Sequence, residues 1–247
     1  FPSWSEFLLR SAMLRSALFL LTYVFLTIFW GSLGVLVGWM LPYRQRFAFI
    51  IGAWTAMVLG AFEHLCQVKV EVEGLEHLPS TPCLVLARHE STWETLFLQQ
   101  LFAPQATVIK KELLAIPFFG WAFSLLRPIA IDRKDGRGAL KTLIREGKAR
   151  LESGSWVVLF PEGTRLAPTE QRRFGRGGPA LALAAKVPVL LVAHTAGDRW
   201  PARKWRKSPG KLRVRISPPF SAEKESSSAF TARLEHWLEE AQRDLRT

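Results

Sequence analysis

The sequence predicts an α/β protein with a mixed, largely parallel sheet flanked by helices, preceded by an N-terminal two-helix membrane motif. From about residue 67, short β-rich runs alternate with helical stretches, a pattern typical of α/β domains. Before that point, two long apolar runs lack any charge. We therefore expect membrane-embedded helices in residues 1–66 and an α/β domain in residues 67–247.

The first apolar run, residues 16–41, contains no charged side chain. As a helix it would be roughly 39 Å long at ~1.5 Å per residue, against a hydrocarbon core of ~30 Å. It can therefore span a membrane with tilt, or bend into a hairpin. Gly31, Ser32 and Gly34 lie in mid-run, where a bend costs least. A second uncharged run covers residues 47–62.

The orientation of these segments is not fixed by their flanking charges. The first run is too long for a signal peptide and lacks a cleavage site. Arg10 and Arg15 flank one end, and Arg44 and Arg46 flank the other, so the positive-inside rule does not choose a direction. Equal flanks favour a re-entrant or monotopic helix pair over a simple span. A buried soluble helix pair is the alternative.

The remaining elements follow from hydrophobic periodicity and from helix-ending residues. Helices are expected over residues 94–102, over residues 138–153 with Gly154 as a C-cap, and over about the last 20 residues. Strands are expected over residues 67–74, 83–89, 106–111, 128–133, 155–163, 187–195 and 211–217.

Several enzyme classes lack support in this sequence. No GxGxxG follows a strand, and neither a GxxxxGK[ST] loop nor a GxSxG elbow occurs, which argues against dinucleotide enzymes, P-loop enzymes and serine hydrolases. Cys66 and Cys83 give neither a disulfide framework nor metal-ligand spacing.

The chain is strongly basic, with a net charge of +12, and most of this charge lies after residue 66. Beside a membrane segment, anionic lipid is the simplest partner for such a surface. Residues 199–215 contain Lys and Arg but no acid, with Trp200 and Trp205 interleaved. That stretch suits a membrane surface, an acidic acyl carrier protein, a solvated face or nucleic acid.

One candidate catalytic pair follows the predicted strand at residues 83–89. His89 and Glu94 are five positions apart. If a helix begins near Ser91, Glu94 lies in its first turn and can reach back to His89. A carboxylate on one imidazole nitrogen fixes the tautomer and stabilises the imidazolium. The other nitrogen can then accept a proton from an alcohol. An ordinary polar strand end is the alternative.

A second cluster follows the predicted strand at residues 155–163. The segment 160–165 reads Phe-Pro-Glu-Gly-Thr-Arg. Gly163 allows close backbone approach to a ligand, Thr164 adds a hydroxyl donor, and the planar fork of Arg165 suits phosphate. The cluster can hold a phosphomonoester. A tight turn with a surface salt bridge is the alternative.

Together, the two motifs resemble the glycerophospholipid acyltransferase family, and within it the bacterial 1-acylglycerol-3-phosphate (lysophosphatidate) acyltransferases. The first family motif, usually Asn-His-x4-Asp, falls on residues 88–94. The second, a basic residue after a short apolar strand, falls on residues 129–133. The third is residues 160–165, unaltered, and the fourth matches residues 187–192.

The sequence departs from the family pattern at three positions. Glu94 replaces the usual Asp, which keeps the carboxylate and adds a methylene. Arg88 stands where Asn is frequent, and Leu191 replaces the second Pro of the fourth motif. The carboxylate of Glu94 should still orient His89.

The resemblance implies that an acyl group passes from acyl-CoA or an acyl-acyl carrier protein to the sn-2 hydroxyl of 1-acyl-glycerol 3-phosphate, making phosphatidic acid. His89 is the implied general base, assisted by Glu94. Neither a metal nor another cofactor is required. The implied substrate-binding residues are Lys110, Arg133, Glu162, Gly163, Thr164 and Arg165.

The family resemblance also implies a location and partners. We expect the inner (cytoplasmic) membrane, with the catalytic domain on the cytoplasmic side. The expected partners are membrane lipids, lysophosphatidic acid and the acyl donor, and we expect no nucleic acid. The alternatives are an acyltransferase for another glycerolipid or lyso-lipid acceptor, and a non-catalytic membrane protein that binds anionic lipid.

Overall fold

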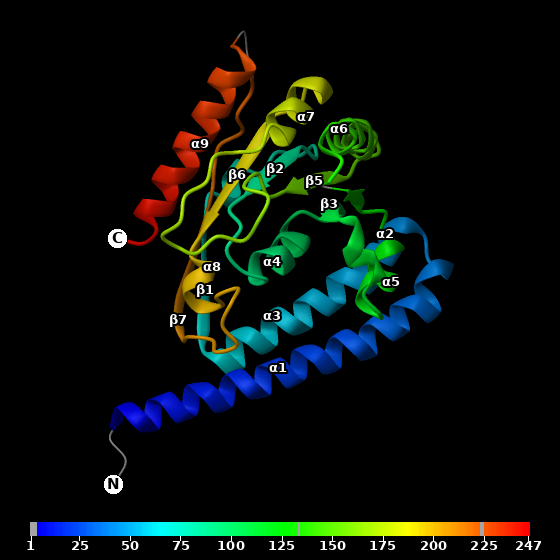
Figure 1. Cartoon of the computed structure of the whole chain (residues 1–247). Coiled ribbons are helices and arrows are strands. Elements are labelled where there is room, and N and C mark those ends of the chain that lie inside the picture. Colours follow the sequence, from blue (N-terminus) through cyan, green and yellow to red (C-terminus); the bar gives the residue numbers. More distant parts are fainter. Residues whose placement is uncertain (1–3, 133, 223–224) are drawn as a thin grey trace.

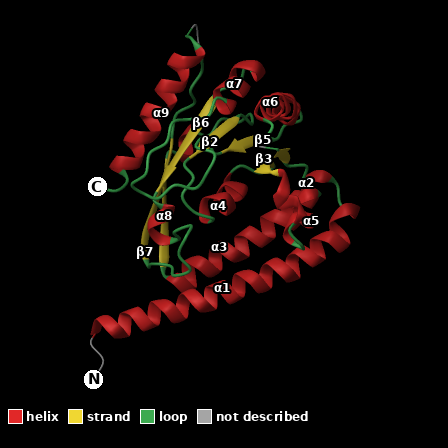
Figure 2. Ribbon diagram, viewed as in Figure 1, coloured by secondary structure: helices red, strands yellow, loops and turns green. Residues whose placement is uncertain are grey.

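A mixed seven-stranded sheet forms the centre of the part of the chain that the structure describes (Figures 1 and 2). The structure is a computed structural model, and it describes residues 4–132, 134–222 and 225–247. The strand order is β1-β7-β6-β2-β5-β3-β4. An α/β fold with a mixed, largely parallel sheet is therefore confirmed.

The elements follow one another largely as the sequence predicts. The helices are α1 (Trp4–Val37), α2 (Tyr43–Phe47), α3 (Ala53–Cys66), α4 (Trp93–Leu101), α5 (Phe119–Ser124), α6 (Gly136–Glu152), α7 (Gly177–Ala185), α8 (Ala196–Arg199) and α9 (Ser227–Asp244). The strands are β1 (Val68–Glu73), β2 (Leu84–Ala87), β3 (Gln105–Lys110), β4 (Ile129–Ile131), β5 (Trp156–Leu159), β6 (Val189–His194) and β7 (Gly210–Ile216). A π-helical stretch, Ala48–Gly52, joins α2 to α3.

The described sheet is parallel except at one pair of neighbouring strands. Strands β6, β2, β5, β3 and β4 run parallel to one another. Strand β7 pairs antiparallel with β6, and β1 pairs parallel with β7. The carboxyl ends of the five parallel strands therefore meet at one edge of the sheet, where ligand sites of such folds collect.

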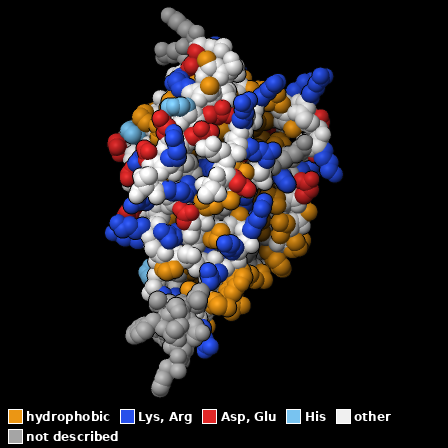
Figure 3. Space-filling model, turned by 60° about the vertical axis from the view of Figure 1, so that its left-hand side comes forward, with side chains coloured by type: hydrophobic (Ala, Val, Ile, Leu, Met, Phe, Trp, Pro, Cys, Tyr) orange, Lys and Arg blue, Asp and Glu red, His pale blue; other side chains and the backbone are white. Residues whose placement is uncertain are grey.

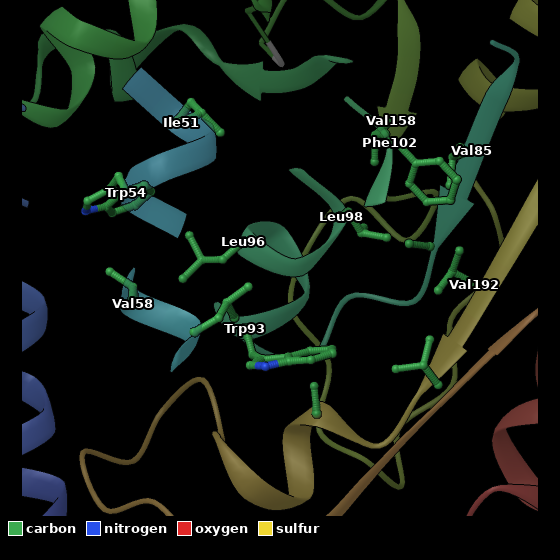
Figure 4. Packing of buried hydrophobic residues seen from close by; sticks show 14 of the residues in the cluster. Ile51, Trp54, Val58, Val85, Trp93, Leu96, Leu98, Phe102, Val158 and Val192 are labelled. Carbon is green, nitrogen blue, oxygen red and sulfur yellow. The ribbon is translucent and has the colours of Figure 1, made fainter. Parts of the chain in front are cut away.

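Side chains alternate between the two faces of the sheet, as the pleat requires. On β2, Val85 and Ala87 join the apolar core beneath α3 and α4. Leu84 and Leu86 join the core beneath α6, α7 and α9. Figure 4 shows the first of these cores, where side chains of α3 and α4 meet those of β2, β5 and β6. Helices therefore cover both faces.

The N-terminal helices form a hairpin that packs along the sheet domain. Helix α1 continues unbroken past Gly31 and Gly34, and the chain turns only after Val37. Of the two alternatives for this run, the bend at Gly31 to Gly34 is therefore wrong. A Cβ at Gly31 would lie 3.0 Å from the Phe118 backbone, so the small residue lets α1 approach the segment before α5.

Two described helical segments are long and apolar enough to cross a membrane, Arg10–Met40 and Tyr43–Cys66, with mean hydropathies of 2.0 and 1.5. Arg15 on α1 hydrogen-bonds Gln67, just beyond α3, so these two points lie at the same end of the hairpin. Many large apolar side chains of α1 are exposed, Leu14 to 72% and Leu21 to 69%. These features are consistent with membrane association. The domain boundary near residue 66 coincides with the end of α3 and stays a prediction.

Gly120 in α5 is a position where the fold demands glycine. A Cβ there would lie 2.5 Å from the Leu113 carbonyl oxygen and 2.6 Å from that of Leu114. Gly120→Ala should therefore lower the free energy of unfolding by about 1–3 kcal/mol. The thermal unfolding midpoint in detergent measures this. Gly136→Ala is the control, since a Cβ at Gly136 meets open space. Equal midpoints for the two variants would contradict the packing account.

Candidate active site

The two sequence motifs meet because of strand order. Strand β2 lies between β5 and β6, and the loops after β2 and β5 leave the same edge of the sheet. The loop after β2 carries His89, and the loop after β5 begins at Phe160. The imidazole of His89 stacks on the ring of Phe160, with centroids 4.0 Å apart and planes at 18°.

His89 and Glu94 form the hydrogen-bonded pair that the sequence predicts. Glu94 lies in the first turn of α4, and its Oε1 atom is 2.8 Å from His89 Nδ1. The same oxygen accepts hydrogen bonds from the backbone N–H groups of Glu90 and Ser91. The carboxylate is fully buried, whereas the imidazole is 15% exposed. Among the described residues, no group hydrogen-bonds Nε2 of His89, so that nitrogen can meet a substrate.

Opposing effects act on the Glu94 carboxyl. Burial alone would raise its pKa, but the hydrogen bond from His89, the nearby His194 and His89 rings, and the Ser91 N–H lower it, and the net direction is downward. Glu94 is therefore held as a carboxylate. A carboxylate at Nδ1 favours the tautomer with the proton on Nδ1 and stabilises a positive charge on the ring.

Glu162 connects the two motifs. Its Oε2 atom accepts the backbone N–H of His89 at 3.0 Å, and its Oε1 atom accepts a hydrogen bond from Arg88 at 3.0 Å. Both oxygens are thus engaged within the protein, and Glu162 helps to position the backbone of His89. A direct contact of Glu162 with substrate stays a prediction.

A buried polar network extends from the Arg88–Glu162 pair to helix α9. Arg88 also donates to Glu90. The Glu90 carboxylate in turn accepts from Gln242, from Arg246 and from the Gly197 N–H. A cavity of about 470 Å³ separates the segment after Glu162 from α9, and Arg88, Glu162, Gln242 and Arg246 line part of it. The loop that carries His89 is therefore held by hydrogen bonds to Glu162 on one side and, through Glu90, to Gln242 and Arg246 on the other.

His194 at the end of β6 has a structural environment. Its Nε2 atom lies 2.8 Å from the Arg88 carbonyl oxygen, and its Nδ1 atom accepts the Ala196 N–H at 3.2 Å. The side chain is completely buried. Because both ring nitrogens are occupied within the protein, His194 helps to fix the loop rather than exchanging protons with a substrate.

Three other predicted residues lie beside the His–Glu pair. Gly163 has a φ of +71° in the turn that follows β5, which favours glycine. Thr164 and Arg165 are exposed. Arg165 Nε donates to the Ser91 carbonyl oxygen at 3.0 Å, which fixes the arginine next to the loop that carries His89. Its terminal nitrogens donate no hydrogen bond to any described residue.

The last two predicted residues, Lys110 and Arg133, are not both placed by the structure. Lys110 ends β3 and is exposed, at the same edge of the sheet but two strands from β2. Arg133 follows β4 and lies outside the described residues. The structure therefore brings together His89, Glu94, Glu162 and Arg165, and it leaves the joint action of Lys110 and Arg133 a prediction.

Sequence reasoning missed several residues that hold the site. Arg88 and Glu90 flank His89 in the motif, so a signal was available: charged residues adjoining a buried strand need partners. Gln242 on α9 and Arg246 just beyond its end carried no such signal, because they lie more than 150 positions away in a segment with many other polar residues.

Comparison with known proteins identifies the family. The model of the Acyltransferase family matches residues 69–195, which hold both motifs. The chain belongs to the acyltransferase family.

Within this family, the chain is 42% identical over 235 residues to the 1-acyl-sn-glycerol-3-phosphate acyltransferase of Pseudomonas aeruginosa, covering 94% of this chain and 91% of that protein. It is 33% identical to the 1-acyl-sn-glycerol-3-phosphate acyltransferase alpha of Mus musculus, over 65% of this chain and 58% of the mouse protein.

A solved structure supports the fold of this acyltransferase. The crystal structure of the 1-acyl-sn-glycerophosphate acyltransferase from Thermotoga maritima superposes with a TM-score of 0.79. The match covers 96% of this chain and 97% of that chain at 22% identity. At this identity the similarity concerns the fold, including its N-terminal helices.

The buried Glu162 makes stability depend on pH in a defined direction. Burial raises its pKa from an ordinary 4.5 to about 7, against the opposing charge and hydrogen bond of Arg88. Between pH 4.5 and pH 7, Glu162 keeps its proton in the folded protein but loses it in the unfolded chain. The free energy of unfolding therefore falls as pH rises through this range. The thermal unfolding midpoint of Glu162→Gln minus that of wild type should therefore increase from pH 5 to pH 8. A difference that stays constant over this range would contradict a raised pKa for Glu162.

Proposed function

We propose that this acyltransferase moves a fatty acyl group from an acyl thioester to the sn-2 hydroxyl of 1-acyl-glycerol 3-phosphate, producing phosphatidic acid. The observation that carries the proposal is the His89–Glu94 pair, at 2.8 Å, presented at the end of β2 with Nε2 free among the described residues. The relatives named 1-acyl-sn-glycerol-3-phosphate acyltransferase support the choice of acceptor.

His89 is the proposed general base. Nε2 takes the proton of the acceptor hydroxyl as its oxygen attacks the thioester carbonyl. Glu94 stabilises the imidazolium through Nδ1. General-base assistance of this kind is worth roughly 10²–10⁴-fold in rate. The buried carboxylate and the two backbone N–H groups on Glu94 hold this geometry before substrate arrives.

The proposed reaction then completes by collapse of the tetrahedral intermediate. The C–S bond breaks as the new ester C–O bond is kept, and the leaving thiolate takes the proton held on His89. Acyl ester and free thiol are the products, and the imidazole returns to its neutral form. Hydrogen-bond donors near the thioester oxygen would stabilise the intermediate, and Lys110 is the candidate that the family resemblance supplies.

Arg165 is the proposed main contact of the acceptor phosphate. Its Nε atom is anchored on the Ser91 carbonyl, which leaves the terminal nitrogens to form charge-assisted hydrogen bonds with a phosphate. Arg133 and Lys110 are proposed to assist from the ends of β4 and β3, and Gly163 and Thr164 to line the pocket. The proposed donor is acyl-CoA or an acyl-acyl carrier protein, and we place the enzyme at the inner membrane with the site on the cytoplasmic side.

The direct test of the base is His89→Ala, assayed in detergent with lysophosphatidate and a long-chain acyl thioester. The turnover number should fall roughly 10²–10⁴-fold, with phosphatidic acid identified by mass spectrometry. His236→Ala is the control, because His236 is exposed on α9, and it should retain wild-type turnover. An alanine variant at position 89 that keeps more than a few per cent of activity would show that another group is the base.

The phosphate contact has a separate test. Arg165→Ala should raise the KM for lysophosphatidate roughly 10–100-fold, since a hydrogen bond to a charged group is worth about 1.5–3 kcal/mol. Arg173→Ala removes an exposed arginine from the same loop and should leave KM unchanged. Activity that is equal on lysophosphatidate and on an acceptor without phosphate would refute a phosphate site at Arg165.

A further inference from the structure

The segment between α8 and β7, residues 200–209, is fixed against the N-terminal helices; we call it the basic loop. Trp200 is buried and meets Phe19 of α1 edge-on at 4.8 Å and Phe62 of α3 at 5.0 Å. The backbone N–H of Lys207 donates to Ser16 Oγ on α1 at 2.8 Å. Figure 1 shows this loop directly above α1 and α3. Its position relative to the helices is therefore set by packing.

The cations of the basic loop divide into two groups. Lys207 is buried, with Nζ donating to the Trp205 carbonyl and lying 5.2 Å from the Trp200 ring. Burial lowers the pKa of Lys207 to about 8. Arg203, Lys204 and Arg206 are exposed, and their side chains form no hydrogen bond or ion pair with any described residue. The indole of Trp205 is 50% exposed.

The loop and the exposed apolar row of α1 lie on opposite faces of that helix. The loop contacts the face that carries Ser16 and Phe19. Leu14, Leu18 and Leu21 project from the other face and are exposed. An interfacial helix buries its apolar face ~5–10 Å into the boundary of headgroups and acyl chains. Because an α-helix with its side chains is ~10–12 Å across, the inner face of α1, and the loop on it, then lie at headgroup level.

The charge and the side-chain types of the basic loop suit the lipid headgroup layer. Trp residues are enriched at the membrane–water interface, and Lys and Arg are attracted to anionic headgroups. Residues 199–215 contain no acid that could neutralise the three exposed cations. Figure 3 shows apolar side chains gathered on one side of the lower half of the molecule, with Lys and Arg side chains beside them. An RNA or an acidic carrier would also meet the cations, but would leave the exposed apolar row of α1 uncovered.

We propose that the basic loop is a second membrane contact, distinct from the apolar helices, in which Arg203, Lys204 and Arg206 bind anionic lipid headgroups and Trp205 inserts between them. The partner is the surface of a bilayer that contains anionic phospholipid. This contact fixes the depth of the N-terminal half of α1 and makes membrane engagement depend on lipid charge. It concerns docking, so it stands or falls independently of the acyl-transfer chemistry.

A fluorescent label in place of Trp205 tests the proposal. Cys66 and Cys83 are buried, so Trp205→Cys can be labelled selectively in the full-length protein. The labelled protein is reconstituted into phosphatidylcholine vesicles with or without phosphatidylglycerol, and lipids with a shallow spin label quench the probe. Quenching should be strong with anionic lipid and should weaken at least about twofold in neutral vesicles or at high salt.

Matched charge variants complete the test. Arg203→Gln, Lys204→Gln and Arg206→Gln together should abolish the dependence on anionic lipid. The control triple, Arg137→Gln, Lys141→Gln and Lys148→Gln, removes three exposed cations from α6 on the far side of the sheet and should not change it. Both triples should retain wild-type turnover in detergent micelles, which separates docking from catalysis.

Three results would overturn the proposal. One is equal quenching in neutral and anionic vesicles. Another is loss of quenching in both triple variants to the same extent. The last is a label that responds to RNA or to an acidic acyl carrier protein but not to vesicles, which would assign the loop to a different partner.

Discussion

The Glu162 carboxylate holds the site together. It accepts the backbone N–H of the proposed base and the guanidinium of Arg88 at once, and so it ties the loop after β5 to the loop after β2. Arg88 continues the contact to Glu90, and Glu90 accepts hydrogen bonds from Gln242 of α9 and from Arg246 just beyond it. Removing one partner of a buried ion pair costs about 3–5 kcal/mol, because the other charge stays buried without compensation. Such a network fixes one arrangement of the loop, and a base must be held in one arrangement before it meets a hydroxyl.

The order of the strands brings Glu162 to the loop that carries His89, and the N-terminal helices give the domain an exposed apolar row. Placing β2 between β5 and β6 brings two motifs that are far apart in sequence to one edge. Helices α3 and α4 complete the apolar core beneath the sheet, while α1 packs on α3 and leaves a row of large apolar side chains uncovered. The site therefore belongs to a domain with a row of exposed apolar side chains along α1. This arrangement would suit the proposed reaction, in which the acceptor is held in lipid and the donor arrives from water.

Much of this organisation could be predicted from the sequence. Short β-rich runs, alternating in residues 67–74 and 211–217 and mostly apolar in the others, predicted the seven strands of the described sheet, and Gly154 marked the end of α6, where the structure gives it a φ of +77°. The five-residue spacing of His89 and Glu94 predicted their contact, because a helix starting between them turns the carboxylate back. Helices α5, α7 and α8 were not predicted, since α5 and α8 are too short to show a period and α7, GGPALALAA, has no polar face that would reveal one.

Other features depend on tertiary contacts that sequence patterns do not carry. Gly31 and Gly34 suggested a bend, yet they serve close packing against α5 in an unbroken helix. Glu162 was expected to shape a substrate pocket, and its main described contacts are with the protein itself. Gln242 of α9 and Arg246, two residues beyond its end, reach the site only because the C-terminal helix packs beside β6. Partners so distant along the chain leave no local signal.

The tautomer of His89 decides whether the ring can act as proposed, because the surrounding hydrogen bonds hold Nδ1 against Glu94 and leave Nε2 without a described partner. Nitrogen-15 NMR of histidine-labelled protein in detergent, with the His89 signal assigned by its loss in a variant, reports which ring nitrogen carries the proton. We expect a neutral ring protonated on Nδ1, with Nε2 unprotonated. A neutral ring protonated on Nε2 would contradict this expectation, since that nitrogen could not then accept the proton of the acceptor hydroxyl.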